Sequence, residues 1–247
     1  MSNFLILVPA RFGSSRFPGK PLAKIFDKPM IQYVVENCQA SGFDYAVVTD
    51  DQKIEDAVIA FDGNVVRVDD DVPTGSERIA LAYDRFYAHK NYQYIINVQG
   101  DEPLLTGSII KDLGSSHASS PFDIYTAVKE RSASDEEFLN PNIVKCVKSK
   151  LSDQCLYFSR QPIPFDRNQE MKTWYQHIGV YSYKVDALKS FVTMPQSEYE
   201  KIEKLEQLRA LENGLTIGAK TIDVNLYGVD APEDIKKIEG VLGEQKK

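Results

Sequence analysis

Residues Phe4–Leu22 read FLILVPARFGSSRFPGKPL, an apolar run that continues into a loop rich in glycine, serine and basic residues. A continuous apolar run of this kind predicts a strand that is buried on both faces, as the strands of parallel sheets are. The run Phe4–Val8 is too short for a signal core or a membrane span, and Pro9 and Arg11 follow it closely. We therefore expect a cytoplasmic protein with this strand inside a parallel sheet.

Strand and helix patterns alternate through the first half of the chain. Short apolar runs predict strands at 45–49, 64–68 and 94–98, and helical spacing predicts helices at 30–39, 53–61 and 76–89. Strands separated by helices in this way imply right-handed crossovers and a parallel sheet. In such sheets ligands bind beyond the carboxyl ends of the strands. The functional site should therefore lie on the loops that follow Ala10, Thr49, Val68 and Val98.

The second half of the chain has a different pattern. Strands are predicted at 124–129, 143–149, 155–159 and 177–184, with a continuous helix at 198–213 and a tail helix at 232–242. The predicted fold class is therefore α/β, with a mainly parallel, doubly wound, Rossmann-like sheet and a smaller mixed lobe in the second half. Because no clear linker divides the chain, we expect a single domain over 1–247, with about 124–200 forming the lobe.

Composition and charge limit the possible functions. Apolar residues make up 43% and charged residues 26%, which is ordinary globular usage and argues against disorder. The 36 acidic residues outnumber the 29 basic ones, so the net charge of -7 disfavours general binding to a nucleic-acid backbone. Any anion must therefore be held by a local basic pocket. Cys38, Cys146 and Cys155 show no CxxC spacing, as expected in a reducing compartment.

The loop Arg11–Pro21 is the candidate for that pocket. Its glycines let backbone N–H groups approach an anion closely, and its basic side chains supply the charge that a triphosphate requires. The spacing of Gly13 and Gly19, and the proline after Lys20, exclude a Walker loop. The G-x-G-x-x-G fingerprint is also missing, which argues against a nicotinamide dehydrogenase. The alternative to a phosphate loop is a basic surface turn rich in glycine and proline.

Six blocks of the sequence resemble, in order, those of one family. They are LVPARFGSSRFPGKPL (7–22), NVQGDEP (97–103), YFSRQPIP (157–164), HIGVYSY (177–183), LEQLRALENG (205–214) and GVDAPED (228–234). The blocks are similar to those of the sugar nucleotidyltransferases that activate 2-keto sugar acids with CTP. Within that group they resemble the cytidylyltransferase family that acts on 3-deoxy-manno-octulosonate (Kdo). The resemblance covers nearly the whole chain, because the blocks run from Leu7 to Asp234.

The resemblance implies a nucleotidyltransferase that converts CTP and Kdo into CMP-Kdo and pyrophosphate, with Mg²⁺, for lipopolysaccharide biosynthesis. The anomeric hydroxyl of the sugar would attack the α-phosphate in line, a step that requires positioning and charge neutralisation. Lys20, Asp101 and Asp230 are the implied catalytic residues, and the two aspartates are the implied Mg²⁺ ligands. The same resemblance implies a homodimer formed through the second lobe.

Further site residues follow from the resemblance. The implied nucleotide-binding residues are Ala10, Arg11, Gly13, Ser14, Ser15, Lys20, Ser76, Arg78 and Gln99. Of these, Ser76, Arg78 and Gln99 would contact the edge of cytosine. The implied sugar-acid residues are Arg160, His177, Tyr181, Glu206 and Gln207. The planar guanidinium of Arg160 suits a carboxylate because it can bind both oxygens.

Simpler roles are open for several of these residues. Asp230 also fits a helix N-cap, and Arg78 fits the surface of a helix. His177 fits a structural histidine in an apolar strand, and Glu206 and Gln207 fit a solvated helix face. For Lys20 and Asp101, position at the ligand edge of the sheet argues for a site independently of the resemblance.

Some positions depart from the usual pattern of the family. Val72 stands where a histidine is usual, and Ser15, Phe17 and Phe165 also differ. These departures leave the sugar acid open, so 8-amino-3,8-dideoxy-manno-octulosonate is an alternative substrate. A regulatory module that binds nucleotide without catalysis is the alternative from another class. The joint presence of Lys20 and the two implied metal ligands argues against that module.

Overall fold

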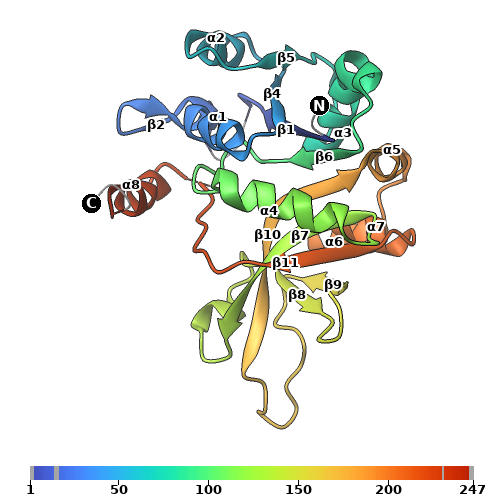
Figure 1. The fold of residues 1–247 in the computed structure, drawn as a ribbon. Coiled ribbons are helices and arrows are strands. Elements are labelled where there is room, and N and C mark those ends of the chain that lie inside the picture. Colours follow the sequence, from blue (N-terminus) through green and yellow to red (C-terminus); the bar gives the residue numbers. More distant parts are fainter. Residues whose placement is uncertain (1–2, 14–16, 230, 245–247) are drawn as a thin grey trace. The chain divides into compact units, whose positions relative to one another are not determined.

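The computed structural model describes residues 3–13, 17–229 and 231–244. The chain forms two compact units, of which unit 1 comprises 1–114 and 225–247 and unit 2 comprises 115–224. Both units combine helices with strands, which confirms the predicted α/β class (Figure 1). The predicted lobe, about 124–200, falls within unit 2, and its role stays a prediction. In the described part of the chain, no helix has the length and apolar character needed to cross a bilayer.

The sheet of unit 1 contains parallel strands in the order β6, β1, β4 and β5. Their bounds are β1 (Phe4–Ala10), β4 (Asp44–Thr49), β5 (Val65–Arg67) and β6 (Tyr94–Asn97). Ala10 pairs with Thr49, and Thr49 pairs with Arg67, so the strands end at one edge of the sheet. The side chains from Leu5 to Val8 are fully buried, as the apolar run predicts. The parallel arrangement is therefore confirmed.

Helices follow the strands of unit 1, and three of them lie near the predicted positions: α1 (Met30–Ser41), α2 (Gln52–Ala60) and α3 (Gly75–Ala82). The sequence pattern did not predict α4 (Gly107–Ala118), which ends within the residues of unit 2. Side chains cap two of these helices: Asp51 accepts hydrogen bonds at the start of α2, and Thr74 does so at the start of α3. Each cap satisfies backbone N–H groups that have no partner within the helix.

The predicted helix at 76–89 is only partly α-helical. After α3 the chain continues as a π-helical turn at Tyr83–Tyr87 and a 3-10 turn at Ala88–Lys90. Tyr83 is buried, and the ring of Tyr87 meets the edge of Tyr92 with 6.5 Å between centroids. The sequence pattern shows helical spacing but gives no signal for this change of helix type.

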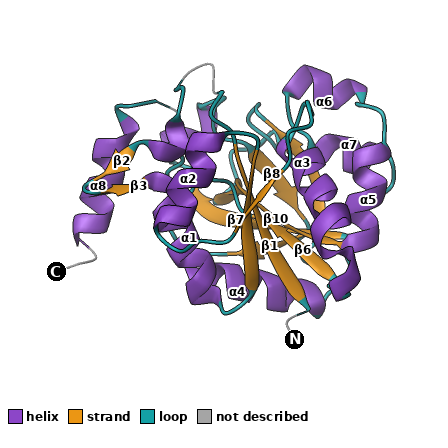
Figure 2. Cartoon of the chain, turned by 90° about the horizontal axis from the view of Figure 1, so that it is seen from above, coloured by secondary structure: helices purple, strands orange, loops and turns teal. Residues whose placement is uncertain are grey.

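The C-terminal segment packs against the start of the chain. Helix α8 (Asp234–Glu244) lies beside the short hairpin of β2 (Lys24–Ile25) and β3 (Lys28–Pro29), as both views show (Figures 1 and 2). Together these segments form an apolar cluster of Ile25, Met30, Leu104, Val229 and Ile238, all at most 5% exposed. Burying one such side chain stabilises the fold by about 1.5–3 kcal/mol. This cluster fixes the chain at Val229, immediately before Asp230.

Unit 2 has a mixed sheet, as predicted for the second half. Its strands are β7 (Ile124–Ser132), β8 (Lys145–Lys148), β9 (Cys155–Ser159), β10 (Thr173–Lys184) and β11 (Ile217–Thr221). Strand β10 is antiparallel to β7 and β8, β9 is antiparallel to β8, and β11 is parallel to β7. Strand β10 begins four residues earlier than predicted, and the sequence analysis did not predict β11. The pairing of β10 with β7 shifts register between Ile178 and Tyr181.

The predicted continuous helix at 198–213 is wrong. The structure has α6 (Glu198–Glu203) and α7 (Gln207–Glu212), which lie side by side (Figure 2), preceded by α5 (Val185–Thr193). Lys204 has φ of 55°, a left-handed conformation that ends α6. The chain then turns so that Arg209 of α7 binds Glu200 of α6 through two hydrogen bonds, of 2.8 and 2.6 Å. This buried ion pair requires two helices rather than one.

Candidate active site

The loop after β1 is closed at its base by the backbone. The N–H of Gly19 donates to the carbonyl of Phe12 at 2.8 Å, and Gly19 has φ of 70°. A side chain at Gly19 would be strained by that φ and would lie about 3.1 Å from the Phe12 ring, so glycine is required there. Ala10 is buried at the end of β1, and Gly13 is exposed. Ser14 and Ser15 lie outside the described residues.

Lys20 meets two remote segments of the chain. Its ammonium donates to Asp101, 81 residues away, and to the carbonyl of Val229, 209 residues away, at 2.8 Å for the latter. The N–H of Val229 in turn donates to the backbone carbonyl of Asp101 at 3.4 Å. The structure therefore brings Lys20 and Asp101 together and places the chain before Asp230 beside them. Asp230 lies outside the described residues.

The cluster of Lys20, Asp101 and Val229 has the chemistry of a phosphate and cation site. The Lys20 side chain is 15% exposed and that of Asp101 is 31% exposed, so both groups are partly shielded from water but reachable. The Lys20 ammonium has three N–H donors, and two of them bond to other described residues. A phosphate oxygen can therefore bind Lys20, and the carboxylate of Asp101 is an oxygen ligand of the kind that Mg²⁺ prefers.

Arg11 lies in a different part of this edge of the sheet. Its guanidinium donates to the carbonyls of Val72 and Pro73, at 2.5 and 3.4 Å. Arg11 therefore fixes the turn after β5 in this structure, and among the described residues it forms no ion pair with Asp101.

Arg78 is buried rather than on a helix surface. It is 2% exposed, ion-paired to Asp50 at 2.7 Å, and bonded to the backbone carbonyls of Val68 and Asp70. Burial lowers the pKa of Arg78, and the charge of Asp50 opposes that effect. Arg78 thus ties α3 to the segments that follow β4 and β5. Ser76, two residues before Arg78, is also buried.

Gln99 follows β6 at the same edge of the sheet as the loop after β1. Its side-chain amide donates to the Asn97 side chain at 3.1 Å, and Asn97 is itself 2% exposed. Asn97 therefore fixes the orientation of the Gln99 side chain. The role of Gln99, like those of Ser76 and Arg78, stays a prediction.

In unit 2, His177 and Tyr181 lie together on β10. Their ring centroids are 5.4 Å apart. The register shift of β10 against β7, between Ile178 and Tyr181, falls between these two residues in the sequence. Burial lowers the pKa of His177 to about 3, so its imidazole is neutral at physiological pH. Burial also raises the pKa of Tyr181 well above its usual value, and the charges of Tyr183 and Glu206 add to this rise.

Thr126 determines the tautomer of His177, and the sequence analysis did not identify this residue. The Thr126 hydroxyl lies 3.1 Å from His177 Nε2 and within 3.1 Å of the carbonyls of Ile178 and Val180. Because carbonyls only accept, the arrangement that satisfies most groups has the hydroxyl donating to one carbonyl and accepting from Nε2–H. His177 Nδ1 is then an acceptor, suited to a hydroxyl donor of a ligand.

Two further residues that the sequence analysis missed fix Arg160. The carboxylate of Glu203 accepts from the backbone N–H of Arg160 at 2.9 Å, and the carbonyl of Glu203 accepts from Arg160 Nε at 2.8 Å. The fully buried ammonium of Lys145 donates to the carbonyl of Arg160 at 2.7 Å, and also to the carbonyls of Asn140 and Ile143. A buried lysine inside a strand is rare, and no sequence pattern separates it from an exposed one.

Gln207 is the first residue of α7, and Glu206 is its N-cap. Gln207 is 6% exposed and its side-chain nitrogen is buried without a hydrogen-bond partner among the described residues. The interpretation of Gln207 as part of a solvated helix face is therefore wrong. A buried donor without a partner is costly, so its presence here points to a ligand that supplies an acceptor. Glu206 is half-buried and lies close enough to Tyr181 to raise its pKa. The structure thus gathers His177, Tyr181 and Glu206, and their ligand stays a prediction.

Comparison with known proteins gives the class and the family. A family profile described as cytidylyltransferase matches residues 5–222. Transfer of a nucleotidyl group fits a site in which a lysine and a carboxylate meet at the carboxyl edge of an α/β sheet. The protein is a nucleotidyltransferase. More specifically, the chain belongs to the cytidylyltransferase family.

Individual relatives and structures agree with this assignment. The chain is 42% identical to 3-deoxy-manno-octulosonate cytidylyltransferase of Thermodesulfovibrio yellowstonii, covering 96% of this chain and 97% of that one. The enzyme of the same name from Photobacterium profundum is 40% identical, with coverage of 98% and 100%. A solved structure of CMP:2-keto-3-deoxy-manno-octonic acid synthetase complexed with CTP has a TM-score of 0.91 and 35% identity, covering 99% of this chain and 100% of its own.

A more distant structure shares the fold. It is a cytidylyltransferase from Leptospira borgpetersenii, with a TM-score of 0.65 and 14% identity, covering 99% of this chain and 88% of its own. At that identity the likeness supports the fold alone.

Proposed function

We propose that this cytidylyltransferase transfers the cytidylyl group of CTP to Kdo, forming CMP-Kdo and pyrophosphate in the cytoplasm for lipopolysaccharide biosynthesis. The observation that carries the proposal is the meeting of Lys20 with Asp101 and the carbonyl of Val229. Relatives about 40% identical over nearly the whole chain carry the name of this activity, and a similar solved structure holds CTP.

The reaction is an in-line displacement at the α-phosphate. The anomeric oxygen of the sugar acid forms a bond to the α-phosphorus, the bond from that phosphorus to the bridging oxygen of the β-phosphate breaks, and pyrophosphate leaves. Lys20, which in the free protein donates to Asp101 and to the carbonyl of Val229, would donate hydrogen bonds to phosphate oxygens as negative charge is redistributed among them. The proposed backbone and side-chain contacts of Ala10, Arg11, Gly13, Ser14 and Ser15 position the triphosphate for this step.

Mg²⁺ fits the residues present at this site. Asp101 offers a partly exposed carboxylate, and the carbonyl of Val229 brings the chain close to it. Mg²⁺ takes a few carboxylates and fills its shell with phosphate oxygens and water, so an ion at this site needs few protein ligands. Asp101 and Asp230 would hold the ion, which supplies positive charge to the phosphate oxygens when bound.

Cytosine recognition is assigned to Ser76, Arg78 and Gln99. Gln99 is the most direct candidate because Asn97 orients its amide. The guanidinium of Arg78 already binds Asp50 and the backbone carbonyls that follow β5. It would act mainly by holding the segments after β4 and β5 in place around the base.

The sugar acid is assigned to the cluster of unit 2. Arg160, held by Glu203 and Lys145, suits the sugar carboxylate. His177 offers an acceptor for a sugar hydroxyl, and the unpartnered nitrogen of Gln207 offers a donor. Tyr181 and Glu206 complete the proposed contacts. A buried donor without a protein partner is expected where a ligand supplies the acceptor.

A homodimer through unit 2 is part of the proposal. Large apolar side chains of this unit are exposed in the single chain, with Leu139 at 71%, Leu151 at 99% and Phe165 at 87%. We assign these side chains to the contact with a second copy of the chain, which would remove them from water. Sedimentation velocity tests the assignment directly, because a monomer at micromolar concentration would contradict it.

Pyrophosphate release tests the proposed activity. The purified chain is incubated with CTP, Mg²⁺ and either Kdo, its 8-amino analogue or another keto sugar acid. Release with Kdo is expected. Release with the 8-amino analogue alone would assign the alternative substrate, and CTP binding without release with any acid would instead indicate a regulatory module. Lys24→Ala, which changes an exposed lysine near Lys20, is the matched control for Lys20→Ala.

A further inference from the structure

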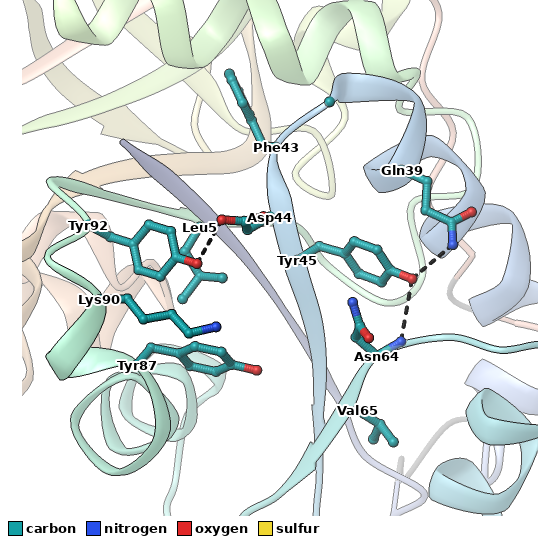
Figure 3. Close-up of a pocket in the computed structure, with 11 residues that line it drawn as sticks. Leu5, Gln39, Phe43, Asp44, Tyr45, Asn64, Val65, Tyr87, Lys90 and Tyr92 are labelled. Atoms are coloured by element: carbon teal, nitrogen blue, oxygen red, sulfur yellow. Dashed lines mark hydrogen bonds between the residues drawn. The ribbon is translucent and has the colours of Figure 1, made fainter. Parts of the chain in front are cut away.

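A pocket of about 490 Å³ lies in unit 1, away from the proposed active site. It is lined by residues that precede or begin strands, among them Leu5, Asp44 and Asn64, and by Tyr87, Lys90 and Tyr92 (Figure 3). Because the strands are parallel, these residues lie at the amino edge of the sheet. The proposed nucleotide-binding loops follow the carboxyl ends of the same strands. From Leu5 to Ala10 a strand extends about 17 Å, which is the distance between the two edges of the sheet.

The size and walls of this pocket fit a small ring. Volumes of about 300–1,000 Å³ are typical of small-molecule sites. The rings of Tyr87 and Tyr92 form an edge-to-face pair with 6.5 Å between centroids and 64° between planes. Tyrosine rings offer apolar faces to C–H groups and polar hydroxyls at their edges. The π-helical turn at Tyr83–Tyr87 is the local irregularity that carries Tyr87 to this place, and such turns are frequent at functional sites.

Lys90 gives the pocket a cation that forms no ion pair with a carboxylate of the described residues. Its ammonium lies 5.6 Å from the centroid of the Tyr87 ring. Figure 3 shows Lys90 and Tyr87 extending side by side into the pocket. An exposed lysine over an aromatic ring is held in place yet keeps its donors for an anion.

The other polar groups of the pocket are held in fixed orientations. Tyr92 is 6% exposed and its hydroxyl donates to Asp44 at 2.8 Å, which leaves the second oxygen of this exposed carboxylate to accept from a ligand. The Tyr45 hydroxyl accepts from the side-chain amide of Gln39 at 2.9 Å and from the backbone N–H of Asn64 at 3.4 Å. Its own proton has no acceptor among the described residues and is therefore available to a ligand.

We propose that this pocket binds a hydroxylated ring that carries one acidic group, such as a sugar phosphate or a sugar acid. The acidic group binds Lys90, and the face of the ring packs on Tyr87 and Tyr92. Ring hydroxyls donate to Asp44 and accept from Tyr45. The charges of the two side chains fix the direction of the ligand, because an acidic group beside the Asp44 carboxylate would be repelled and one beside the Lys90 ammonium is attracted.

Amide chemical shifts test this site in the intact protein. Glucose 6-phosphate and glucuronate are titrated separately, with CTP present to occupy the nucleotide site, and neutral glucose is the comparison. Shifts centred on Asn64, Val65, Tyr87 and Lys90 are expected with one or both acidic probes, and the stronger of the two distinguishes a phosphate from a carboxylate. The proposal is overturned if neither acidic probe shifts these amides, or if glucose shifts them equally.

Substitutions assign the binding to the pocket. Lys90→Ala should weaken binding of the acidic probe about tenfold or more, because it removes a charged hydrogen bond. Tyr45→Phe keeps the ring and should weaken binding less. Lys28→Ala is the matched control, since Lys28 also lies over a tyrosine ring of unit 1, at 5.5 Å from Tyr33, but does not line the pocket. Equal affinity in Lys90→Ala and the parent protein would refute the assignment.

Discussion

Removal of Arg209 should destabilise unit 2 strongly. Arg209 and Glu200 are 5% and 2% exposed and share two hydrogen bonds, of 2.8 and 2.6 Å. Arg209→Met leaves the Glu200 carboxylate buried with only its contacts to Ser197 and Gln196. Breaking one side of a buried pair costs about 3–5 kcal/mol. At about 2–4 °C for each kcal/mol in a chain of this length, the melting temperature should fall by about 6–20 °C.

The pH dependence of this loss identifies its cause. Burial raises the pKa of Glu200, but the hydrogen bonds from Arg209 and from the Ser197 backbone outweigh burial, so the pKa in the folded parent is lowered. The parent therefore loses this stability as pH falls below the ordinary glutamate range. In Arg209→Met burial dominates, the folded-state pKa rises, and protonation relieves the buried charge as pH falls. The difference in stability between the two proteins should consequently shrink from pH 7 towards pH 4.

Urea unfolding followed by circular dichroism measures these free energies. The double variant Arg209→Met with Glu200→Met should recover much of the loss, because no unpaired charge stays buried. Arg85→Met is the matched control: Arg85 binds Asp70 through two hydrogen bonds of 2.6 and 2.8 Å on the surface, and no measurable loss is expected. A loss below about 1 kcal/mol in Arg209→Met, or a double variant as unstable as the single one, would show that an unpaired buried charge is not what destabilises unit 2.

Two further predictions concern buried basic groups. His117 is fully buried, and burial lowers its pKa to about 4. Between pH 6.5 and about 4 the unfolded chain therefore binds a proton that the folded one does not, and the free energy of unfolding should fall by up to about 1.4 kcal/mol per pH unit. His117→Asn should flatten that part of the stability profile, and unfolding curves with the same slope in both proteins would exclude the assignment. Lys145→Met should cost about 3 kcal/mol or more and raise the KM for the sugar acid more than it lowers kcat, since three carbonyls, including that of Arg160, lose their donor. Lys150→Met, at an exposed lysine, should change neither the free energy of unfolding nor the KM. An unchanged KM in a folded Lys145→Met variant would contradict the positioning role of Lys145.

Burial explains which strands were predictable. The run at Phe4–Ala10 is apolar because its residues are enclosed on both faces, and that enclosure leaves a pattern in the sequence. The order of the parallel strands then places Lys20 and Asp101 at the same edge of the sheet. Val229 gave no such signal, because its contribution to the site is a backbone carbonyl that any residue has.

Other features depend on contacts that have no local pattern. The spacing at 198–213 is helical throughout, yet the buried pair of Glu200 and Arg209 requires a turn at Lys204. Lys145 lies in a strand that was predicted, but its burial depends on three carbonyls that the fold brings together. Thr126 acts on His177 through strand pairing across 51 residues. Tertiary contacts therefore decided these positions, and local propensity did not.

Steady-state kinetics of Lys20→Ala measure whether Lys20 and Asp101 act on the same substrate. If Lys20 and Asp101 converge on the phosphates of CTP, kcat for pyrophosphate release should fall by about 100-fold or more, while the KM for the sugar acid changes little. Asp101→Asn should abolish Mg²⁺-dependent turnover without unfolding the protein, and combining the two changes should add little further loss. A Lys20→Ala variant with normal kcat and only a raised KM for the sugar acid would contradict the account.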